Sequence, residues 1–284
     1  VTNLEADHLE IYGDLRGVRE GFLTFLAGVR GGGRIIACAD DHGASSLLPH
    51  VGTAGLSYGT SAGSMLRAID VRVTESHTRC TVVEEGSVVG EMTLSLGGLH
   101  NLRNALAASA AARALNVDWT AILSGLADFR GVGRRFERLG ESKGVIVVDD
   151  YAHHPTEIQA TLAAARSMFP ERRLVVAFQP HLYSRTRDFA ADFGAALAAA
   201  DVAWITDVFP ARELPIPGVT GRTVASEVEA VGHSDVRYVE ELDALSEALA
   251  DALDDGDVLI TLGAGSIETL GASVLARLEA RVHA

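Results

Sequence analysis

Residues 145–157 read VIVVDDYAHHPTE, and this stretch indicates the fold of the chain more directly than any other. Four apolar residues bounded by charged ones are typical of a short buried strand. Pro155 then favours the first turn of a helix, and an Ala-rich run continues it to Phe169. A buried strand followed directly by a helix is the repeating unit of a parallel sheet that helices cover.

The same alternation of strands and helices continues to the end of the chain. Apolar strands are predicted at 145–148, 174–178, 202–206 and 258–262, and helices at 156–168, 188–199, 240–252 and 266–281. This order predicts an α/β domain over residues 134–284, with a mainly parallel sheet and helices on both faces.

Residues 1–133 follow another pattern and are expected to form a separate domain. An amphipathic helix is predicted over 14–29 and a buried strand over 34–39. The alternating pattern from 56 to 96 predicts a meander of short antiparallel strands, and helices follow at 101–115 and 119–126. This domain should therefore contain a mixed sheet that continues into an antiparallel meander.

Polar side chains gather directly after the strand at 145–148. They are two carboxylates, a phenol and two imidazoles, namely Asp149, Asp150, Tyr151, His153 and His154. Ligands of open α/β sheets bind at the carboxyl ends of the strands. A helix cap would explain only one of these side chains, so we interpret the cluster as a functional site.

A second polar segment, QPHLYSRTRD at 179–188, follows the strand at 174–178. We expect it to lie beside the first cluster, because both follow carboxyl ends of strands in one sheet. Its Arg185 and Arg187 can hold a carboxylate or a phosphate in fork geometry. A solvated arginine pair at a helix start is the alternative, and the neighbouring cluster favours the functional interpretation.

Three further segments could bind ligands, although each also has a plain structural explanation. Asn101 and Asn104 share one face at a helix start, where carboxamides can pair with a nucleobase edge or simply cap the helix. The segment NLEADH at 3–8 offers too few oxygens to hold a divalent ion by itself. The glycines of GAGSI at 263–267 could meet an anion or form a tight turn.

Charge and composition argue against several classes of protein. With 38 acidic and 24 basic residues the net charge is −14, which disfavours nucleic acid and anionic membranes as partners. No apolar run has the length of a membrane span, and Cys38 and Cys80 suit a reducing compartment, so we expect a soluble cytoplasmic protein. Lys143 is the only lysine and follows no glycine-rich loop, so the G-x-x-x-x-G-K-[ST] phosphate loop is missing. Since the sequence opens at Val1 without an initiator methionine, we interpret it as a piece of a longer protein.

Seven segments, in order along the chain, resemble the Mur ligases, the ATP-dependent amide-forming enzymes of peptidoglycan assembly. They are TNLEADH (2–8), GLHNLRNALAA (98–108), GVGRRFE (131–137), VDDYAHHPTE (148–157), FQPHLYSRTRDF (178–189), DVFPARELPIPGV (207–219) and LGAGSI (262–267). None is decisive alone, but seven in register make a chance resemblance remote. Within the family, the resemblance is closest to the branch that joins L-alanine to UDP-N-acetylmuramate.

The resemblance implies a fold and a reaction. Residues 1–133 would be the latter part of the central ATP-binding domain, and residues 134–284 a Rossmann-like C-terminal domain that binds amino acid and nucleotide. The UDP-binding domain, the phosphate loop and a magnesium-binding glutamate of the family are missing from this sequence. The implied reaction uses ATP and Mg²⁺ to turn the muramyl carboxylate into an acyl phosphate, which the amine of L-alanine then attacks.

The resemblance also implies roles for individual residues. His8 would be a magnesium ligand. Contacts to the nucleotide would come from His100, Asn101, Asn104, Arg135 and Asp150. The amino acid would be surrounded by Tyr151, His153, His181 and Arg185. Catalysis would depend on His153, Arg185 and Asp150.

Two departures from the family pattern and two alternative functions accompany this interpretation. Several relatives have a carbamylated lysine where this chain has Phe22, and the alanine-adding branch also tends to lack it. Leu182 stands where some relatives have a second arginine, which predicts fewer contacts to the amine substrate.

The alternatives are a murein-peptide-recycling ligase of the same family and a non-catalytic nucleotide-binding fragment. We expect the chain to be inactive alone, and the sequence leaves open whether it is a monomer or a homodimer.

Overall fold

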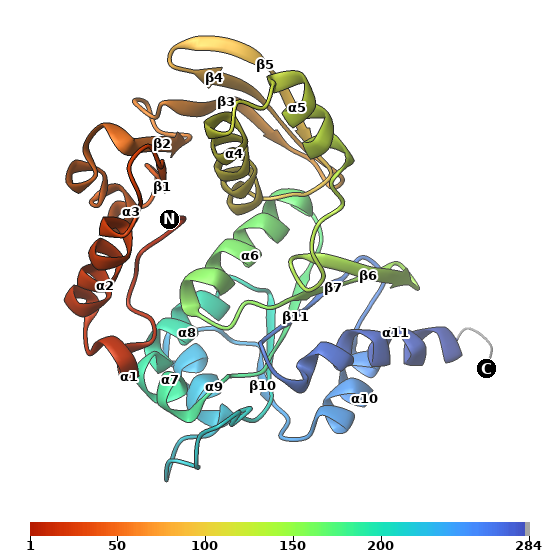
Figure 1. Cartoon of the computed structure of the whole chain (residues 1–284). Helices are drawn as coiled ribbons and strands as arrows, with labels where there is room; N and C mark the ends of the chain where they lie inside the picture. The colour runs from red at the N-terminus through yellow and green to blue at the C-terminus, as the bar shows by residue number, and fades with distance from the viewer. Residues whose placement is uncertain (282–284) are drawn as a thin grey trace. The chain divides into compact units, whose positions relative to one another are not determined.

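The computed structural model describes residues 1–281, which form two compact units: Val1–Arg130, and a second unit that begins at Gly131 (Figure 1). The last three residues of the domain predicted over 134–284 lie outside the described residues. Within 1–281, no helix combines the length and the apolar character needed to cross a membrane.

The first unit is built around a five-stranded sheet in the order β1-β2-β3-β4-β5. Its strands are β1 (Ile35–Cys38), β2 (Gly55–Gly59), β3 (Leu66–Val73), β4 (Thr78–Glu84) and β5 (Ser87–Leu94). The predicted antiparallel meander is confirmed for β3 to β5 and wrong for β2, which runs parallel to both β1 and β3. Short helical turns between β1 and β2 return the chain to the same end of the sheet, and a strand's own pattern does not show its direction.

Helices pack against this sheet. They are α1 (Leu9–Tyr12), α2 (Leu15–Ala27), α3 (His42–Ser45), α4 (Leu99–Ala114) and α5 (Trp119–Asp128), with 3-10 turns at Leu48–His50 and Gly52–Ala54. Helix α4 buries Leu102 and Leu106 completely, in one cluster with Tyr58, Val82 and Met92 of the strands. Each such leucine stabilises the fold by about 2 kcal/mol, so the first half of α4 is held firmly against the sheet.

The second unit contains a six-stranded sheet in the order β10-β9-β8-β11-β7-β6. Its strands are β6 (Glu137–Ser142), β7 (Val145–Asp150), β8 (Leu174–Phe178), β9 (Val202–Ile205), β10 (Val236–Tyr238) and β11 (Val258–Leu262). All pairs are parallel except β6 with β7, which confirms the predicted mainly parallel α/β fold. Two edge strands were not predicted: β6 is rich in charge, as edge strands often are, and β10 is very short.

Helices connect these strands. They are α6 (Pro155–Met168), α7 (Tyr183–Asp188), α8 (Ala190–Leu197), α9 (Gly221–Ala230), α10 (Leu242–Ala252) and α11 (Leu270–Ala280), with a 3-10 turn at Ser266–Thr269. The predicted helix 188–199 is wrong at its start, because a separate helix already begins at Tyr183 and ends before Phe189. Helix α9 was not predicted, since Thr223, Val224 and Val228 lower its helix propensity.

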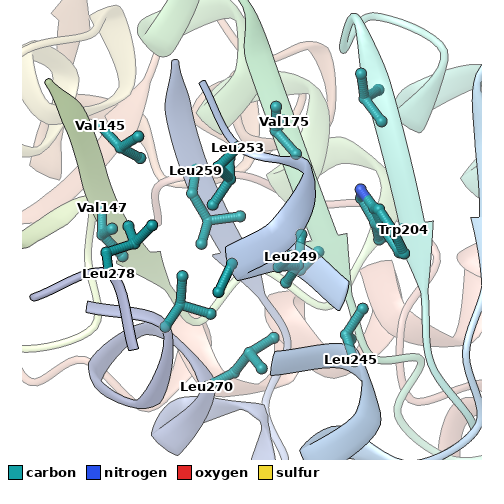
Figure 2. Packing of buried hydrophobic residues seen from close by; sticks show 14 of the residues in the cluster. Val145, Val147, Val175, Trp204, Leu245, Leu249, Leu253, Leu259, Leu270 and Leu278 are labelled. Atoms are coloured by element: carbon teal, nitrogen blue, oxygen red, sulfur yellow. The ribbon is translucent and has the colours of Figure 1, made fainter. Parts of the chain in front are cut away.

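One face of the second sheet packs on α10 and α11 (Figure 2). Val145, Val175 and Leu259 point from three neighbouring strands toward leucines of the helices, among them Leu249 and Leu278. The strands β7, β8, β9 and β11 are buried at every position, which is typical of a parallel sheet covered on both faces. This core therefore holds the carboxyl ends of the parallel strands at one edge, where the polar segments begin.

Candidate active site

The polar segments after β7 and β8 lie beside each other, as predicted, although the two strands are not neighbours in the sheet. The last strand of the chain, β11, lies between β7 and β8 and pairs with both. Periodicity does not reveal strand order, so this insertion could not be predicted. The two segments nevertheless meet, because the ring centroids of His153 and His181 lie 5.6 Å apart.

A row of rings lies at this edge of the second unit. Tyr151 contacts His153 edge to face, with ring centroids 5.1 Å apart. His181 continues the row and stacks on Phe209 at 5.8 Å and 15°. Phe209, in the segment after β9, was not among the predicted site residues. Its neighbours explain its position, because Phe209 N donates to Pro180 O, and Leu182 N donates to Phe209 O.

His181 is a neutral imidazole in this row. Burial, together with nearby His153 and Arg185, lowers the pKa of His181 to about 4. Its Nδ1 is buried and has no hydrogen-bond partner within residues 1–281. A buried polar atom of this kind is usually satisfied by a water or a ligand, which fits the predicted place of His181 beside a substrate.

The structure separates the two adjacent histidines after β7. His153 joins the ring row, and its Nδ1 lies 3.0 Å from Tyr151 O. His154 instead caps α6: it is buried, its side chain accepts a hydrogen bond from Thr156 N, and Glu157 completes a capping box. His154 is therefore used by the helix, whereas His153 lies in the ring row, and its role as a site residue stays a prediction.

Asp150 is a buried carboxyl group that holds the backbone around the site. Its Oδ2 accepts a hydrogen bond from Phe136 N and its Oδ1 accepts one from Ala152 N, each at 2.8 Å. Burial raises the pKa of Asp150 to about 6, although these two donors oppose the shift. Each oxygen still has a lone pair for a ligand, so the predicted nucleotide and catalytic roles of Asp150 are compatible with its contacts.

The adjacent arginines 134 and 135 have different surroundings. Arg134, which was not predicted, donates from Nε to Asp149 Oδ2 at 2.9 Å and from Nη2 to Gly263 O at 2.6 Å. Arg135 is 53% exposed, and the nearest carboxylate in its ion pair, Glu157, is 3.9 Å away. Arg134 is thus used by the fold, whereas Arg135 presents its guanidinium at the surface, as a nucleotide contact requires. No sequence signal distinguishes the two.

The arginines of α7 also differ. Arg185 is buried, with only 7% of its surface exposed, in the short helix beside His181. Arg187 pairs with Asp188 at the surface, which is the solvated alternative that the sequence left open. Glu213 fixes the start of α7 by accepting hydrogen bonds from Ser184 N and Ser184 Oγ. A buried arginine near the His181 imidazole suits a small carboxylate ligand.

In the first unit, the predicted amides lie in the first turns of α4. Asn101 Nδ2 donates to Gly97 O at 2.8 Å, which leaves its oxygen as an acceptor. Asn104 is exposed and His100 is half-buried. This donor and acceptor set fits the edge of a nucleobase but not the phosphates of ATP, for which these residues offer no cation or glycine-rich cradle.

His8 is 56% exposed, has a left-handed backbone (φ 54°), and lies 3.7 Å from Asp7 through Nε2 and Oδ2. In the part of the chain that the structure describes, no three His, Cys, Asp or Glu side chains gather as metal ligands. His8 can therefore serve as one magnesium ligand only if other groups complete the site.

Two family models match the chain, one in each unit. The Mur ligase middle domain matches residues 1–112, and the Mur ligase glutamate ligase domain matches residues 134–265. The chain belongs to the Mur ligase family. It is 45% identical over 280 residues to the UDP-N-acetylmuramate–L-alanine ligase of Geobacter sp. (strain M21), covering 99% of this chain but 61% of that protein. The corresponding ligase of Oleidesulfovibrio alaskensis is 45% identical over 271 residues, and 60% of it is covered.

Solved Mur ligase structures share the fold. The UDP-N-acetylmuramate–alanine ligase MurC of Thermotoga maritima matches with a TM-score of 0.78 and 27% identity, over 98% of this chain and 58% of that one. The MurF ligase of Thermotoga maritima, solved in complex with ADP, matches with a TM-score of 0.74 and 23% identity, over 99% and 62%. The chain thus spans about three fifths of the length of the relatives that it matches.

Proposed function

We propose that this chain is the middle and C-terminal part of an ATP-dependent ligase that joins L-alanine to UDP-N-acetylmuramate in peptidoglycan synthesis. The observation that carries the proposal is the ring row of Tyr151, His153 and His181 beside buried Arg185. The names of the relatives at 45% identity support the same reaction. A cytoplasmic location, where nucleotide precursors are made, belongs to the proposal.

On the amino-acid side, Arg185 would pair with the carboxylate of L-alanine in fork geometry. The amine must lose a proton before it can attack. His153 and neutral His181 can accept hydrogen bonds from it, and the orphan Nδ1 of His181 is such an acceptor when it is unprotonated. Tyr151 would close the row at its other end.

On the nucleotide side, Asn101 and Asn104, with His100 near them, would contact adenine. Arg135 and Asp150 would contact the ribose or phosphates. Mg²⁺ would neutralise the phosphates, with His8 as one of its ligands, and the remaining ligands and the phosphate loop would lie outside this sequence. The ADP complex of a MurF ligase supports nucleotide binding by this fold.

The proposed reaction has two steps. The carboxylate of UDP-N-acetylmuramate takes the γ-phosphoryl group of ATP, which releases ADP and forms an acyl phosphate. The amine of L-alanine attacks the acyl carbon, loses its proton, and displaces phosphate through a tetrahedral intermediate. Positive groups near the developing negative charge, Arg135 among them, would stabilise these states.

Phosphate release in the presence of ATP, UDP-N-acetylmuramate and L-alanine tests the proposal. We expect turnover from the polypeptide extended at its N-terminus to the length of its relatives, and none from the 284 residues alone. Omitting either acceptor should abolish release. Turnover by the short chain, or release without L-alanine, would contradict the proposal.

A pair of variants in the extended polypeptide localises the amino-acid site. Arg185→Ala should raise KM for L-alanine at least about 10-fold, the effect of losing a charge-assisted hydrogen bond. Arg187→Ala should leave that KM within about twofold, because Arg187 pairs with Asp188 at the surface. A murein tripeptide used faster than L-alanine would favour the recycling alternative.

A further inference from the structure

Asp40 is a buried carboxylate at the carboxyl end of β1, in the turn that follows the strand. Its side chain is 4% exposed. The carboxylate packs so closely on Gly59 that a Cβ there would lie 2.5 Å from its Oδ1. The local backbone is therefore shaped to fit this side chain, although neither the sequence motifs nor the proposed reaction gives Asp40 a role.

The hydrogen bonds of Asp40 come from two places in the first unit. Beyond the end of β2, Thr60 and Ser61 each donate from a backbone N–H and a hydroxyl group, at 2.6 to 3.0 Å. From α4, Arg103 Nε donates to Oδ2 at 2.9 Å. These donors together hold the pKa of Asp40 well below its usual range, despite its burial.

These contacts argue against a metal site in this turn. The turn contains two carboxylates and an imidazole, Asp40, Asp41 and His42, which are side chains of the kinds that bind cations. Both oxygens of Asp40 already accept several protein donors, and Asp41 accepts hydrogen bonds from Leu4 N and Ala44 N. The two carboxylates therefore serve as hydrogen-bond acceptors for N–H and O–H groups of the same chain.

Arg103 connects Asp40 to the proposed adenine site. It lies in α4 between Asn101 and Asn104, and its guanidinium is 38% exposed while its partner carboxylate is shielded. One face of α4 is anchored by the buried Leu102, in the first turn, and by Leu106 one turn later, but the N-terminus of the helix has no side-chain cap. The ion pair thus ties this turn to the ends of β1 and β2.

We propose that Asp40 is a positioning residue of the nucleotide site, which acts through Arg103 to hold the first turn of α4, and with it Asn101 and Asn104, in the geometry that receives adenine. This inference rests on the proposed function, since it assumes that these amides meet the base. Asp40 itself would not touch the nucleotide.

Asp41 provides a matched control. It is the adjacent carboxylate, also hydrogen-bonded to backbone N–H groups, and it caps α3 rather than contacting α4. Asp40→Asn and Asp41→Asn both keep the side-chain shape and remove one charge. Both should lower the melting temperature, but only Asp40→Asn should change the first turn of α4.

The experiment uses the extended polypeptide and measures the Kd of ADP by calorimetry in EDTA, so that metal binding does not contribute. We expect Asp40→Asn to weaken ADP about 10-fold, the loss of one charge-assisted bond, and Asp41→Asn to change it less than twofold. Arg103→Met should weaken ADP as much as Asp40→Asn, and the double variant should be no worse than Arg103→Met. Amide hydrogen exchange of the first turn of α4 should rise in Asp40→Asn and stay at the wild-type level in Asp41→Asn.

The possible failures are distinguishable. Wild-type protein that binds no ADP would overturn the adenine site, and this inference with it. Wild-type binding with an unchanged Kd in Asp40→Asn would overturn only the positioning role. Equal weakening in Asp40→Asn and Asp41→Asn would also overturn it, because the effect would then follow general stability.

Discussion

Arg134 should be a major source of stability in the second unit, while its neighbour Arg135 should contribute almost none. The change to compare is Arg134→Met against Arg135→Met, which keeps the aliphatic stem in both. Arg134 loses two well-shielded hydrogen bonds, from Nε to Asp149 Oδ2 at 2.9 Å and from Nη2 to Gly263 O at 2.6 Å. Its hydrogen bond to Glu268 is exposed and contributes little, and its contact over the Tyr151 ring at 5.0 Å is matched by that of Arg135 at 5.5 Å.

The size of the effect follows from these contacts. Two charge-assisted hydrogen bonds contribute about 1.5 kcal/mol each, and Asp149, whose side chain is 3% exposed, is left with Thr261 as its remaining side-chain donor. We expect Arg134→Met to lower the free energy of unfolding by about 3 kcal/mol. Arg135→Met should lower it by less than about 0.5 kcal/mol, since its ion pair with Glu157 is a 3.9 Å contact at the surface.

Urea denaturation followed by tryptophan fluorescence measures this difference. The chain has two tryptophans, Trp119 in the first unit and Trp204 in β9 of the second. In a Trp119→Phe background the signal reports the second unit alone. If Arg134→Met and Arg135→Met lower the free energy of unfolding by amounts that differ by less than about 0.5 kcal/mol, the claim that Arg134 holds the fold and Arg135 does not is refuted.

Three further outcomes follow from the contacts. Protonation of Asp150, whose pKa burial raises to about 6, contributes stability that is complete below about pH 4 and is lost as the pH rises through 6. The unfolding free energy of Asp150→Asn relative to wild type should therefore rise by about 2 kcal/mol from pH 4 to pH 7 in urea titrations. His181 should remain neutral at pH 6 in an NMR titration, and Phe209→Ala, which exposes the ring, should raise its pKa from about 4 toward the ordinary value. Gly265→Ala should destabilise the protein by about 2 kcal/mol or more, because a Cβ would lie 2.5 Å from the Phe209 ring, whereas Gly125→Ala in α5 meets nothing within 4 Å and should stabilise it by about 1 kcal/mol in thermal melts.

The buried strands of the second unit could be predicted because each forms a continuous apolar run in the sequence, such as Val145 to Val148. Segments without that signal could not be predicted. The edge strand β6 carries charge at its exposed positions, and α9 has its buried residues at helical spacing but contains β-branched residues that lower its helix propensity. The order of the strands depends on long-range packing, so the position of β11 between β7 and β8 was not visible in the sequence.

Some site residues could likewise be predicted from the sequence and others could not. A run of polar residues after a buried strand indicates a ligand edge, which is why Tyr151, His153 and Arg185 could be proposed from sequence. The partners that hold them come from distant segments, as Phe209 does for His181. The different surroundings of Arg134 and Arg135 depend on backbone direction, since Arg134 has a left-handed conformation at φ 58°. Tertiary contacts of this kind are not encoded in local spacing.

The proposed acyl phosphate makes a specific demand on the atoms of the substrate. If UDP-N-acetylmuramate labelled with ¹⁸O in its carboxylate is incubated with ATP, L-alanine and the extended polypeptide, one labelled oxygen should appear in the released phosphate, as detected by mass spectrometry. Phosphate released together with UDP-N-acetylmuramoyl-L-alanine but without the label would contradict the proposed activation of the carboxylate, and with it the reaction assigned to this chain.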